Sequence, residues 1–190
     1  QVLLQALHTY QGIIKPAEVL AQEACRIEID VCGKPIGKQD QYIASYGGLR
    51  FIQFHPDETV SVESVSLDDQ LRLELSRRLL LFYTNTTRKS DTILSEEKAN
   101  INDHLEILRQ MKEMVLKGRE CILQGDFDIF GELLHQGWEC KKQLASKISN
   151  SEIDALYETA RQAGAIGGKI TGAGGGGFLL LYCPVEWQRE

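Results

Sequence analysis

The spacing of apolar residues predicts helices at the start of the chain. Residues 2–10 have a helical pattern, and Pro16 stands where a second helix begins, because the first helical N–H groups have no partner in any case. Gly33 and Pro35 are expected to end this second helix. Four apolar residues between these points recur at steps of four, three and four, the spacing of one helical face: Leu20, Ala24, Ile27 and Val31.

A short helix and a β-hairpin are predicted next. The helix spans residues 37–46 and is closed by the glycines that follow it. Residues 49–54 have the composition of a strand. A turn separates them from Val60 and Val62, which alternate with polar residues as a half-buried partner strand would.

The rest of the chain mixes helices with short apolar segments. Residues 68–77 are predicted to be helical and lead into Leu79–Tyr83, a continuous apolar run that indicates a strand covered on both faces. After a polar loop at 84–91, three amphipathic helices occupy residues 103–164, and an apolar strand is expected at Phe178–Cys183. Hairpins and grouped helices favour the α+β class over an alternating doubly wound sheet.

Local sequence also predicts where two of these helices start. Asp126 is the expected cap of the second, and residues 151–154 form an approximate capping box for the third. Phe127, Phe130 and Trp138 recur at helical spacing. We therefore expect them in the core rather than in an aromatic platform for a sugar.

Composition and charge narrow the class of protein. Of 190 residues, 43% are hydrophobic and 25% are charged, which is typical of a folded chain. The net charge of −6 and the absence of long basic clusters disfavour nucleic acid and anionic membranes as partners. Apolar runs are shorter than the roughly 20 residues of a membrane helix. Five cysteines without a Cys-x-x-Cys pair, and histidines without metal spacing, indicate reduced thiols, a cytoplasmic location and no dedicated zinc site.

The strongest candidate for chemistry is the stretch Lys-Ile-Thr-Gly-Ala-Gly-Gly-Gly-Gly at residues 169–177. Its glycines permit left-handed backbone conformations and close approach to a ligand. Free N–H groups in such a loop form a concave anion site suited to phosphate oxygens. A flexible turn between two strands is the alternative, but a helix before the loop and an apolar strand directly after it should anchor both ends. The pattern matches neither a P-loop nor a Rossmann loop.

Asp40 is the second candidate, because it lies among long polar residues just after a glycine turn. A kinase needs a carboxylate beside the acceptor hydroxyl to orient it and receive its proton. Lys38 is placed to keep such a carboxylate ionised and to stabilise developing charge. The alternative, that Asp40 only caps or solvates a short helix, is the more ordinary explanation when these residues are taken alone.

A third candidate is the hydroxyl-rich loop at residues 84–90. Loops that follow a strand often contact ligands. Arg88 offers a planar fork that fits phosphate oxygens, and Thr87 adds a donor. An ordinary solvated loop is the alternative.

Residues 169–177 and the Gly37-x-x-Asp40-Gln41 segment together resemble the GHMP kinases, the superfamily of galactokinase, homoserine kinase, mevalonate kinase and phosphomevalonate kinase. The first stretch is similar to the third, C-terminal glycine motif of that family. The second is similar to the segment carrying the acceptor-side aspartate in the galactokinase branch. Residues 33–48 and 80–94 look most like the members that act on heptose 7-phosphate, and the likeness covers essentially the whole chain.

This resemblance implies a two-domain α+β fold that lacks its N-terminal portion. Residues 1–66 would be the remainder of the N-terminal domain, and residues 67–190 the C-terminal domain of antiparallel strands packed with helices. ATP with Mg²⁺ would be the phosphoryl donor, in a cleft between the domains. The acceptor would be a sugar or sugar phosphate, in particular the anomeric hydroxyl of D-glycero-D-manno-heptose 7-phosphate, although galactose, fucose, an amino sugar or a mevalonate-like acid stay open.

The resemblance also implies roles for individual residues. Asp40 would be the acceptor-side carboxylate, and Lys38 is the second catalytic candidate because of its place beside that carboxylate. A contiguous set of loop residues would lie against the nucleotide and substrate phosphates, or would brace the loop that holds them: Gly172, Ala173, Gly174, Gly175, Gly176 and Gly177. Four further residues would bind the substrate: Gln41, Thr87, Arg88 and Thr171. A catalytically silent regulator that binds sugar and nucleotide is the alternative function.

The departures from the family are informative too. Its first motif and its glycine-and-serine phosphate loop have no counterpart, and its magnesium ligands would precede Gln1. We therefore expect a piece of a longer protein, which alone would bind ATP poorly. Relatives often have glycine where Asn85 stands. The helices at 103–164 make a homodimer possible, although their pattern shows no more than ordinary amphipathicity.

Overall fold

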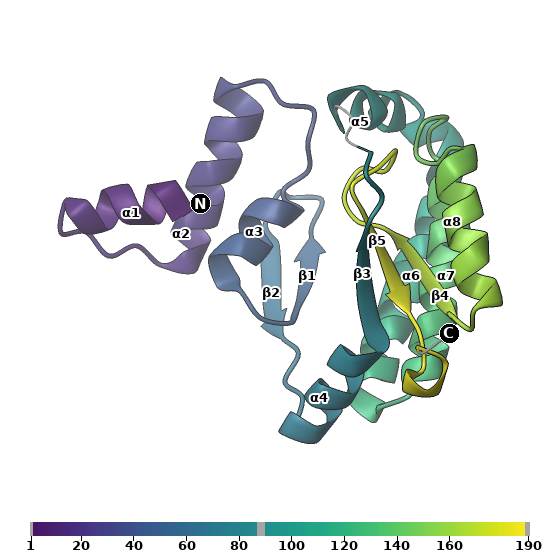
Figure 1. The fold of residues 1–190 in the computed structure, drawn as a ribbon. Coiled ribbons are helices and arrows are strands. Elements are labelled where there is room, and N and C mark those ends of the chain that lie inside the picture. Colours follow the sequence, from purple (N-terminus) through teal and green to yellow (C-terminus); the bar gives the residue numbers. More distant parts are fainter. Residues whose placement is uncertain (1, 87–89, 189–190) are drawn as a thin grey trace. The chain divides into compact units, whose positions relative to one another are not determined.

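The computed structural model describes residues 2–86 and 90–188, drawn in Figure 1. The chain divides into two compact units, residues 1–66 and residues 67–190. Each unit is built from its own helices and its own antiparallel sheet.

The first unit packs helices against a two-stranded hairpin. Its elements are α1 (Val2–Tyr10), α2 (Ala17–Cys25), the π-helix η1 (Arg26–Val31), α3 (Gln39–Tyr46), β1 (Arg50–Phe54) and β2 (Val60–Ser64). The strands pair antiparallel, with Phe54 opposite Val60, as the sequence predicted. The core of the unit is formed by Ala21, Cys25 and Tyr42, and the side chains of Ile52, Val60 and Val62 pack against it.

The predicted apolar face at residues 20–31 is confirmed only in its first half. Leu20 and Ala24 are buried, but Val31 is 69% exposed. From Arg26 onward the helix is a π-helix, in which each N–H reaches back one residue further than in an α-helix. The wider turn changes which side chains share a face, so that Ile29 packs against the core instead.

The second unit combines a three-stranded sheet with a layer of helices. Its elements are α4 (Asp69–Arg78), β3 (Leu79–Tyr83), α5 (Ser90–Ala99), η2 (Ile101–His104), α6 (Leu105–Gln124), α7 (Phe127–Lys142), α8 (Ser151–Gln162), β4 (Gly167–Ile170), β5 (Phe178–Tyr182) and η3 (Val185–Trp187). The strand order is β3-β5-β4, and both pairings are antiparallel. Trp138 from α7, Ile153 and Tyr157 from α8, and Ile170 and Leu179 from the sheet share one core.

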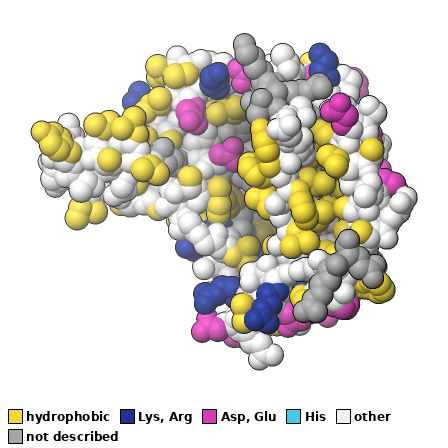
Figure 2. Space-filling view, viewed as in Figure 1, with side chains coloured by type: hydrophobic (Ala, Val, Ile, Leu, Met, Phe, Trp, Pro, Cys, Tyr) yellow, Lys and Arg dark blue, Asp and Glu magenta, His cyan; other side chains and the backbone are white. Residues whose placement is uncertain are grey.

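Strand β3 forms where the sequence predicted it, but the prediction that both its faces are covered was wrong. Leu81, Phe82 and Tyr83 are each more than half exposed. β3 is an edge strand, with β5 as its only partner among the described strands. Figure 2 shows the apolar side chains that gather over β3 and β5. An apolar run indicates a strand, but sheet order decides how much of that strand is covered.

Three details of the helices also differ from the sequence prediction. Helix α5 starts at Ser90, inside the segment that was expected to be a polar loop. The cap of α8 is Asn150, whose side chain accepts from the N–H groups of Glu152 and Ile153, rather than the predicted box starting at Ser151. Asp126 does stand at the start of α7, but its side chain makes no capping hydrogen bond. Of the predicted core positions, Phe127 and Trp138 are confirmed as buried, whereas Phe130 is half-buried.

Two glycines of α7 allow a matched stability test. A Cβ on Gly131 would lie 2.4 Å from Cδ1 of Tyr182. That ring is fully buried, and its hydroxyl donates to Asp128 at 2.7 Å, so it has little freedom to move. Gly131→Ala is expected to lower the unfolding free energy by about 1–3 kcal/mol, as overpacking does. Urea unfolding of the complete protein measures this change.

The control is Gly137→Ala on the same helix. A Cβ there meets no atom within 4 Å. Alanine is the better helix former, so this change should raise the unfolding free energy by about 0.5–1 kcal/mol. Equal effects of the two changes would contradict the packing described here.

Candidate functional site

The glycine-rich loop connects β4 to β5 as the turn of a hairpin. Thr171 N–H donates to the carbonyl of Phe178 at 2.8 Å, and Ile170 lies opposite Leu179 in the ladder below it. Five glycines of the loop have positive φ, a conformation that other residues rarely adopt: Gly172, Gly174, Gly175, Gly176 and Gly177. The glycine content is therefore a requirement of the backbone path.

The loop is tied to two segments that are distant in sequence. Gly175 N–H donates to the carbonyl of Ile148, and Gly177 N–H donates to the carbonyl of Thr86, both at 2.8 Å. Thr84 makes two further hydrogen bonds to the loop. Its N–H donates to the carbonyl of Gly177 at 2.8 Å, and its hydroxyl donates to the same carbonyl at 2.9 Å. These bonds give the loop the anchoring that its flanking elements predicted.

Only some of the loop amides are left for a ligand. The N–H groups of Gly175 and Gly177 are already used, so the expectation of a wholly free row of donors was wrong for these two residues. Within residues 2–86 and 90–188, the N–H groups of the other four loop residues have no acceptor: Gly172, Ala173, Gly174 and Gly176. Four such donors, three of them on glycines with positive φ, still have the chemistry of an anion site.

Asp40 lies in the first turn of α3, in the first unit, and is exposed. Its carboxylate has no hydrogen bond or ion pair with any other described residue. The residue that caps α3 is Lys38, and no side chain makes a capping hydrogen bond there. Asp40 therefore does not act as a helix cap, which removes one of the two ordinary explanations for it.

The neighbours of Asp40 are engaged in contacts inside the first unit. The Lys38 ammonium pairs with Glu58, beside a groove of about 720 Å³ that Glu18 and Tyr42 also line. Gln41 is only 3% exposed, and its amide donates to Glu28. In this structure both side chains thus have structural contacts besides the functional roles predicted for them.

Two tyrosines that sequence reasoning did not single out hold α3 in position. The hydroxyls of Tyr42 and Tyr46 donate to the Glu18 carboxylate of α2 at 2.9 and 2.7 Å. Burial, followed by the hydrogen bond to Glu18, raises the pKa of Tyr42 to about 12. The two hydrogen bonds to Glu18 fix α3, the helix that carries Asp40. The spacing of four residues between the tyrosines was the available signal in the sequence.

The remaining predicted residues divide between described and undescribed parts of the chain. Thr171 lies at the start of the glycine loop, and its hydroxyl donates to the carbonyl of Phe178 at 3.2 Å. Thr87 and Arg88, the predicted phosphate contacts, lie outside the described residues.

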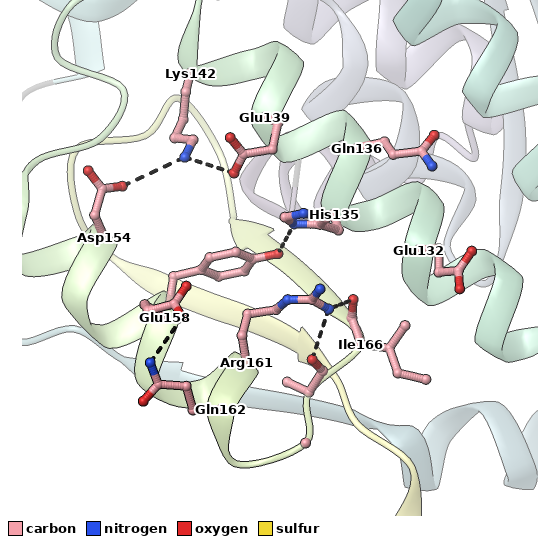
Figure 3. Close-up of a pocket in the computed structure, with 13 residues that line it drawn as sticks. Glu132, His135, Gln136, Glu139, Lys142, Asp154, Glu158, Arg161, Gln162 and Ile166 are labelled. Carbon is pink, nitrogen blue, oxygen red and sulfur yellow. Dashed lines mark hydrogen bonds and ion pairs between the residues drawn. The ribbon is translucent and has the colours of Figure 1, made fainter.

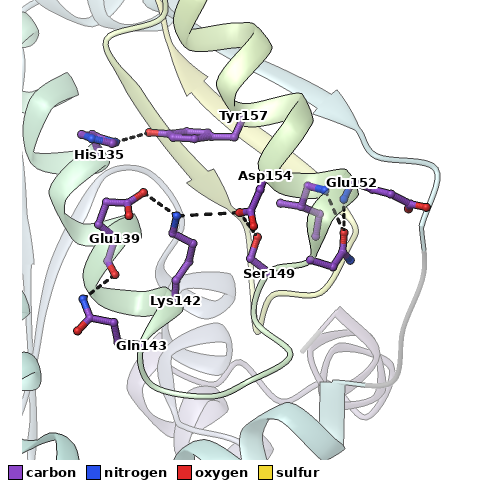
Figure 4. A network of polar contacts seen from close by, with 10 residues as sticks. His135, Glu139, Lys142, Gln143, Ser149, Glu152, Asp154 and Tyr157 are labelled. Carbon is purple, nitrogen blue, oxygen red and sulfur yellow. Dashed lines mark hydrogen bonds and ion pairs between the residues drawn. The ribbon is translucent and has the colours of Figure 1, made fainter.

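A polar groove of about 870 Å³ lies between α7 and α8, and the sequence did not predict it (Figure 3). Tyr157 and His135 share a hydrogen bond of 2.8 Å across the groove. Burial lowers the pKa of His135 and raises that of Tyr157 to about 12. Lys142 lies 2.8 Å from Glu139 and 4.0 Å from Asp154, as Figure 4 shows. These contacts brace one helix against the other, and no residue of the glycine loop lines the groove.

The part of the chain that the structure describes holds neither a cluster of metal ligands nor a membrane-spanning helix. No three His, Cys, Asp or Glu side chains there are grouped to hold a metal ion. No helix of the described residues is both long and apolar enough to cross a bilayer. Of the five free cysteines, only Cys32 is exposed.

Known proteins resemble this chain in both sequence and fold. Residues 119–185, from α6 through the glycine loop and β5, match the family model described as GHMP kinases C terminal. The fold matches a crystal structure of a D-glycero-D-manno-heptose 1-phosphate kinase from Bacteroides thetaiotaomicron with a TM-score of 0.74 and 24% identity, over 98% of this chain and 51% of that one.

Curated relatives agree with the family model. A D-glycero-alpha-D-manno-heptose 7-phosphate kinase from Campylobacter jejuni is 33% identical over 165 residues, which are 86% of this chain and 49% of the relative. A bifunctional fucokinase/GDP-fucose pyrophosphorylase from Arabidopsis thaliana is 31% identical over 161 residues, 81% of this chain and 15% of the relative.

The chain belongs to the GHMP kinase family, as its two motifs indicated. The predicted α+β class, with antiparallel strands packed against helices in the second unit, is confirmed. The chain spans about half the length of the Campylobacter relative and of the Bacteroides structure.

Proposed function

We propose that the complete protein carrying this chain transfers the γ-phosphate of ATP to a hydroxyl of a sugar phosphate. The acceptor is the anomeric hydroxyl of D-glycero-D-manno-heptose 7-phosphate. The observation that carries this proposal is the glycine loop, which has four unused backbone amides, three of them on glycines with positive φ, and is anchored at Ile148 and Thr86. The names of the Campylobacter and Arabidopsis relatives, both sugar kinases, support a sugar as the acceptor.

The proposed reaction needs little covalent chemistry from the protein, because phosphoryl transfer depends on positioning and electrostatics. Asp40 orients the acceptor hydroxyl and receives its proton. The amides of Gly172, Ala173, Gly174 and Gly176 donate to phosphate oxygens of the bound ligands. Gln41, Thr171, Thr87 and Arg88 are kept as proposed substrate contacts.

Lys38 keeps a conditional role in this proposal. Its ammonium pairs with Glu58, whose carboxylate offsets part of the charge that Lys38 could offer the acceptor. This pairing is the observation that favours the second candidate function, a regulator that binds sugar and nucleotide without transfer. A cytoplasmic location and a homodimer stay predictions.

An assay of ADP release by the complete protein separates these functions. The protein is given ATP with heptose 7-phosphate, galactose, fucose, an amino sugar or mevalonate, and calorimetry measures binding of each in parallel. We expect kcat/KM for heptose 7-phosphate to exceed that of each sugar without a phosphate by about 100-fold or more, because a site built for a phosphate is left with unpaired donors when the phosphate is missing.

Three outcomes would contradict the proposal in different ways. Binding of heptose 7-phosphate and ATP without ADP release would identify the regulator. A preference for mevalonate would exclude a sugar as the acceptor. A preference for a sugar without a phosphate would keep the class of reaction and overturn the acceptor.

A further inference from the structure

Two lysines lie at the base of the glycine loop, and the mechanism proposed above does not use them. Lys141 is in the last turn of α7, and its ammonium donates to the carbonyl of Gly172. Lys169 is in β4, two residues before the loop begins. Both side chains are half-buried. The ammonium group of Lys169 has no hydrogen bond or ion pair with the rest of the described chain.

The charges around the two lysines do not balance. Burial lowers the pKa of both lysines, and the charge of Lys169 lowers that of Lys141 further, so the two ammonium groups act on each other. The one carboxylate that acts on Lys141 belongs to Glu97 of α5. Burial raises the pKa of Glu97, and its Oε1 is buried without a hydrogen-bond partner in the described part of the chain. Among the described residues, the two ammonium groups therefore face one carboxylate, that of Glu97.

The surplus of positive charge lies beside unused hydrogen-bond donors. An ammonium group has three donors, and Lys141 uses one of them on Gly172. The amides of Gly172, Ala173 and Gly174 have no acceptor among the described residues. Partly buried like charges are unfavourable unless an opposite charge completes the group. Ammonium groups combined with backbone amides are a recurring way of binding phosphate.

We propose that Lys141, Lys169 and the adjoining amides of the glycine loop form a subsite for a phosphate group of a substrate. The existence of an anion subsite follows from the cluster itself. Its assignment to a substrate rests on the proposed function. The phosphate belongs either to the nucleotide or to the phosphorylated sugar, because both carry the same group.

Lys142 provides a matched control beside Lys141. It is the next residue on the same helix, but its ammonium lies 2.8 Å from Glu139 and takes part in the α7–α8 groove instead. Replacing it removes the same charge from the same helix without touching the glycine loop.

The test measures binding of ADP and of heptose 7-phosphate to the complete protein by calorimetry, with the variants Lys141→Met, Lys169→Met and Lys142→Met. We expect the first two to weaken binding of one of these ligands at least tenfold, and Lys142→Met to change it less than twofold. Loss of ADP affinity assigns the subsite to the nucleotide, and loss of sugar-phosphate affinity assigns it to the acceptor. The variants Lys141→Arg and Lys169→Arg should retain most of the affinity, because the charge is kept.

Wild-type affinity for both ligands in Lys141→Met and Lys169→Met would overturn the proposal, as would an equal loss in Lys142→Met. Thermal unfolding shows whether each variant is folded. If Lys141→Met does not fold, binding to Lys169→Met alone tests the proposal. A second measurement uses inorganic phosphate, whose ³¹P signal should broaden with the wild type and not with the double Met variant. If ADP release fails with every acceptor while this phosphate binding persists, the function is wrong and the subsite stands.

Discussion

Asp40→Asn is expected to lower the turnover number of the complete protein by about two to four orders of magnitude, the usual contribution of a positioned general base. The amide keeps the size of the side chain but cannot take the proton of the acceptor hydroxyl. The Asp40 carboxylate contacts no other described side chain, so its replacement breaks no structural bond. The turnover number is measured as ADP release at saturating ATP and heptose 7-phosphate.

The stability of the variant separates a catalytic loss from a folding defect. Because Asp40 is exposed, Asp40→Asn should change the unfolding free energy by less than about 0.5 kcal/mol. Asp69→Asn is a matched control, because Asp69 is also an exposed residue in the first turn of a helix, and among the described residues its carboxylate pairs with Arg72 alone. It should turn over at the wild-type rate. If Asp40→Asn did so too, Asp40 would not be the acceptor-side carboxylate.

Gly174→Ala is expected to have the second large effect, on the glycine loop itself. Gly174 has φ of 109°, and a Cβ there would lie 2.7 Å from the carbonyl oxygen of Ile148 and 2.9 Å from its Cα. Backbone atoms cannot swing aside as a side-chain end can, so the loop must move and lose the bond from Gly175 N–H to Ile148. We expect the KM for ATP to rise at least tenfold. The unfolding free energy should fall by about 2–4 kcal/mol, from strain and overpacking together.

Gly172→Ala distinguishes the clash from the strain of a left-handed residue. Gly172 has φ of 77°, but a Cβ there meets no atom within 4 Å. Its loss of stability should be about 1 kcal/mol, the cost of the backbone conformation alone. Urea unfolding compares the two variants. An equal loss in both would mean that the contact with Ile148 does not hold the loop.

Local sequence was sufficient for most elements of the fold. The hairpin of Val60 and Val62, the helix at α3 and the strand after the glycine loop follow from periodicity and turn residues, which act over a few positions. The exposure of β3 could not be predicted, because it depends on strand order, and β5 is almost 100 residues away in sequence. The π-helix at Arg26–Val31 has no local signature comparable to a proline or glycine.

In the candidate site, too, local sequence predicted some features and tertiary structure determined the others. The glycine run indicated left-handed backbone, which the structure has, but the acceptors that occupy two of its amides belong to Thr86 and Ile148. The pairing of Lys38 with Glu58 and the clustering of Lys141 with Lys169 depend on which segments fold together. Sequence can therefore nominate residues for a site, whereas their partners come from the tertiary structure.

The most direct test of the central claim is a crystal structure of the complete protein with a non-hydrolysable ATP analogue and heptose 7-phosphate. The glycine loop and Asp40 should then contact one reacting pair of ligands, with the Asp40 carboxylate within about 3.2 Å of the anomeric hydroxyl and loop amides donating to phosphate oxygens. Ligands bound away from the loop, or an acceptor hydroxyl out of reach of Asp40, would contradict the claim.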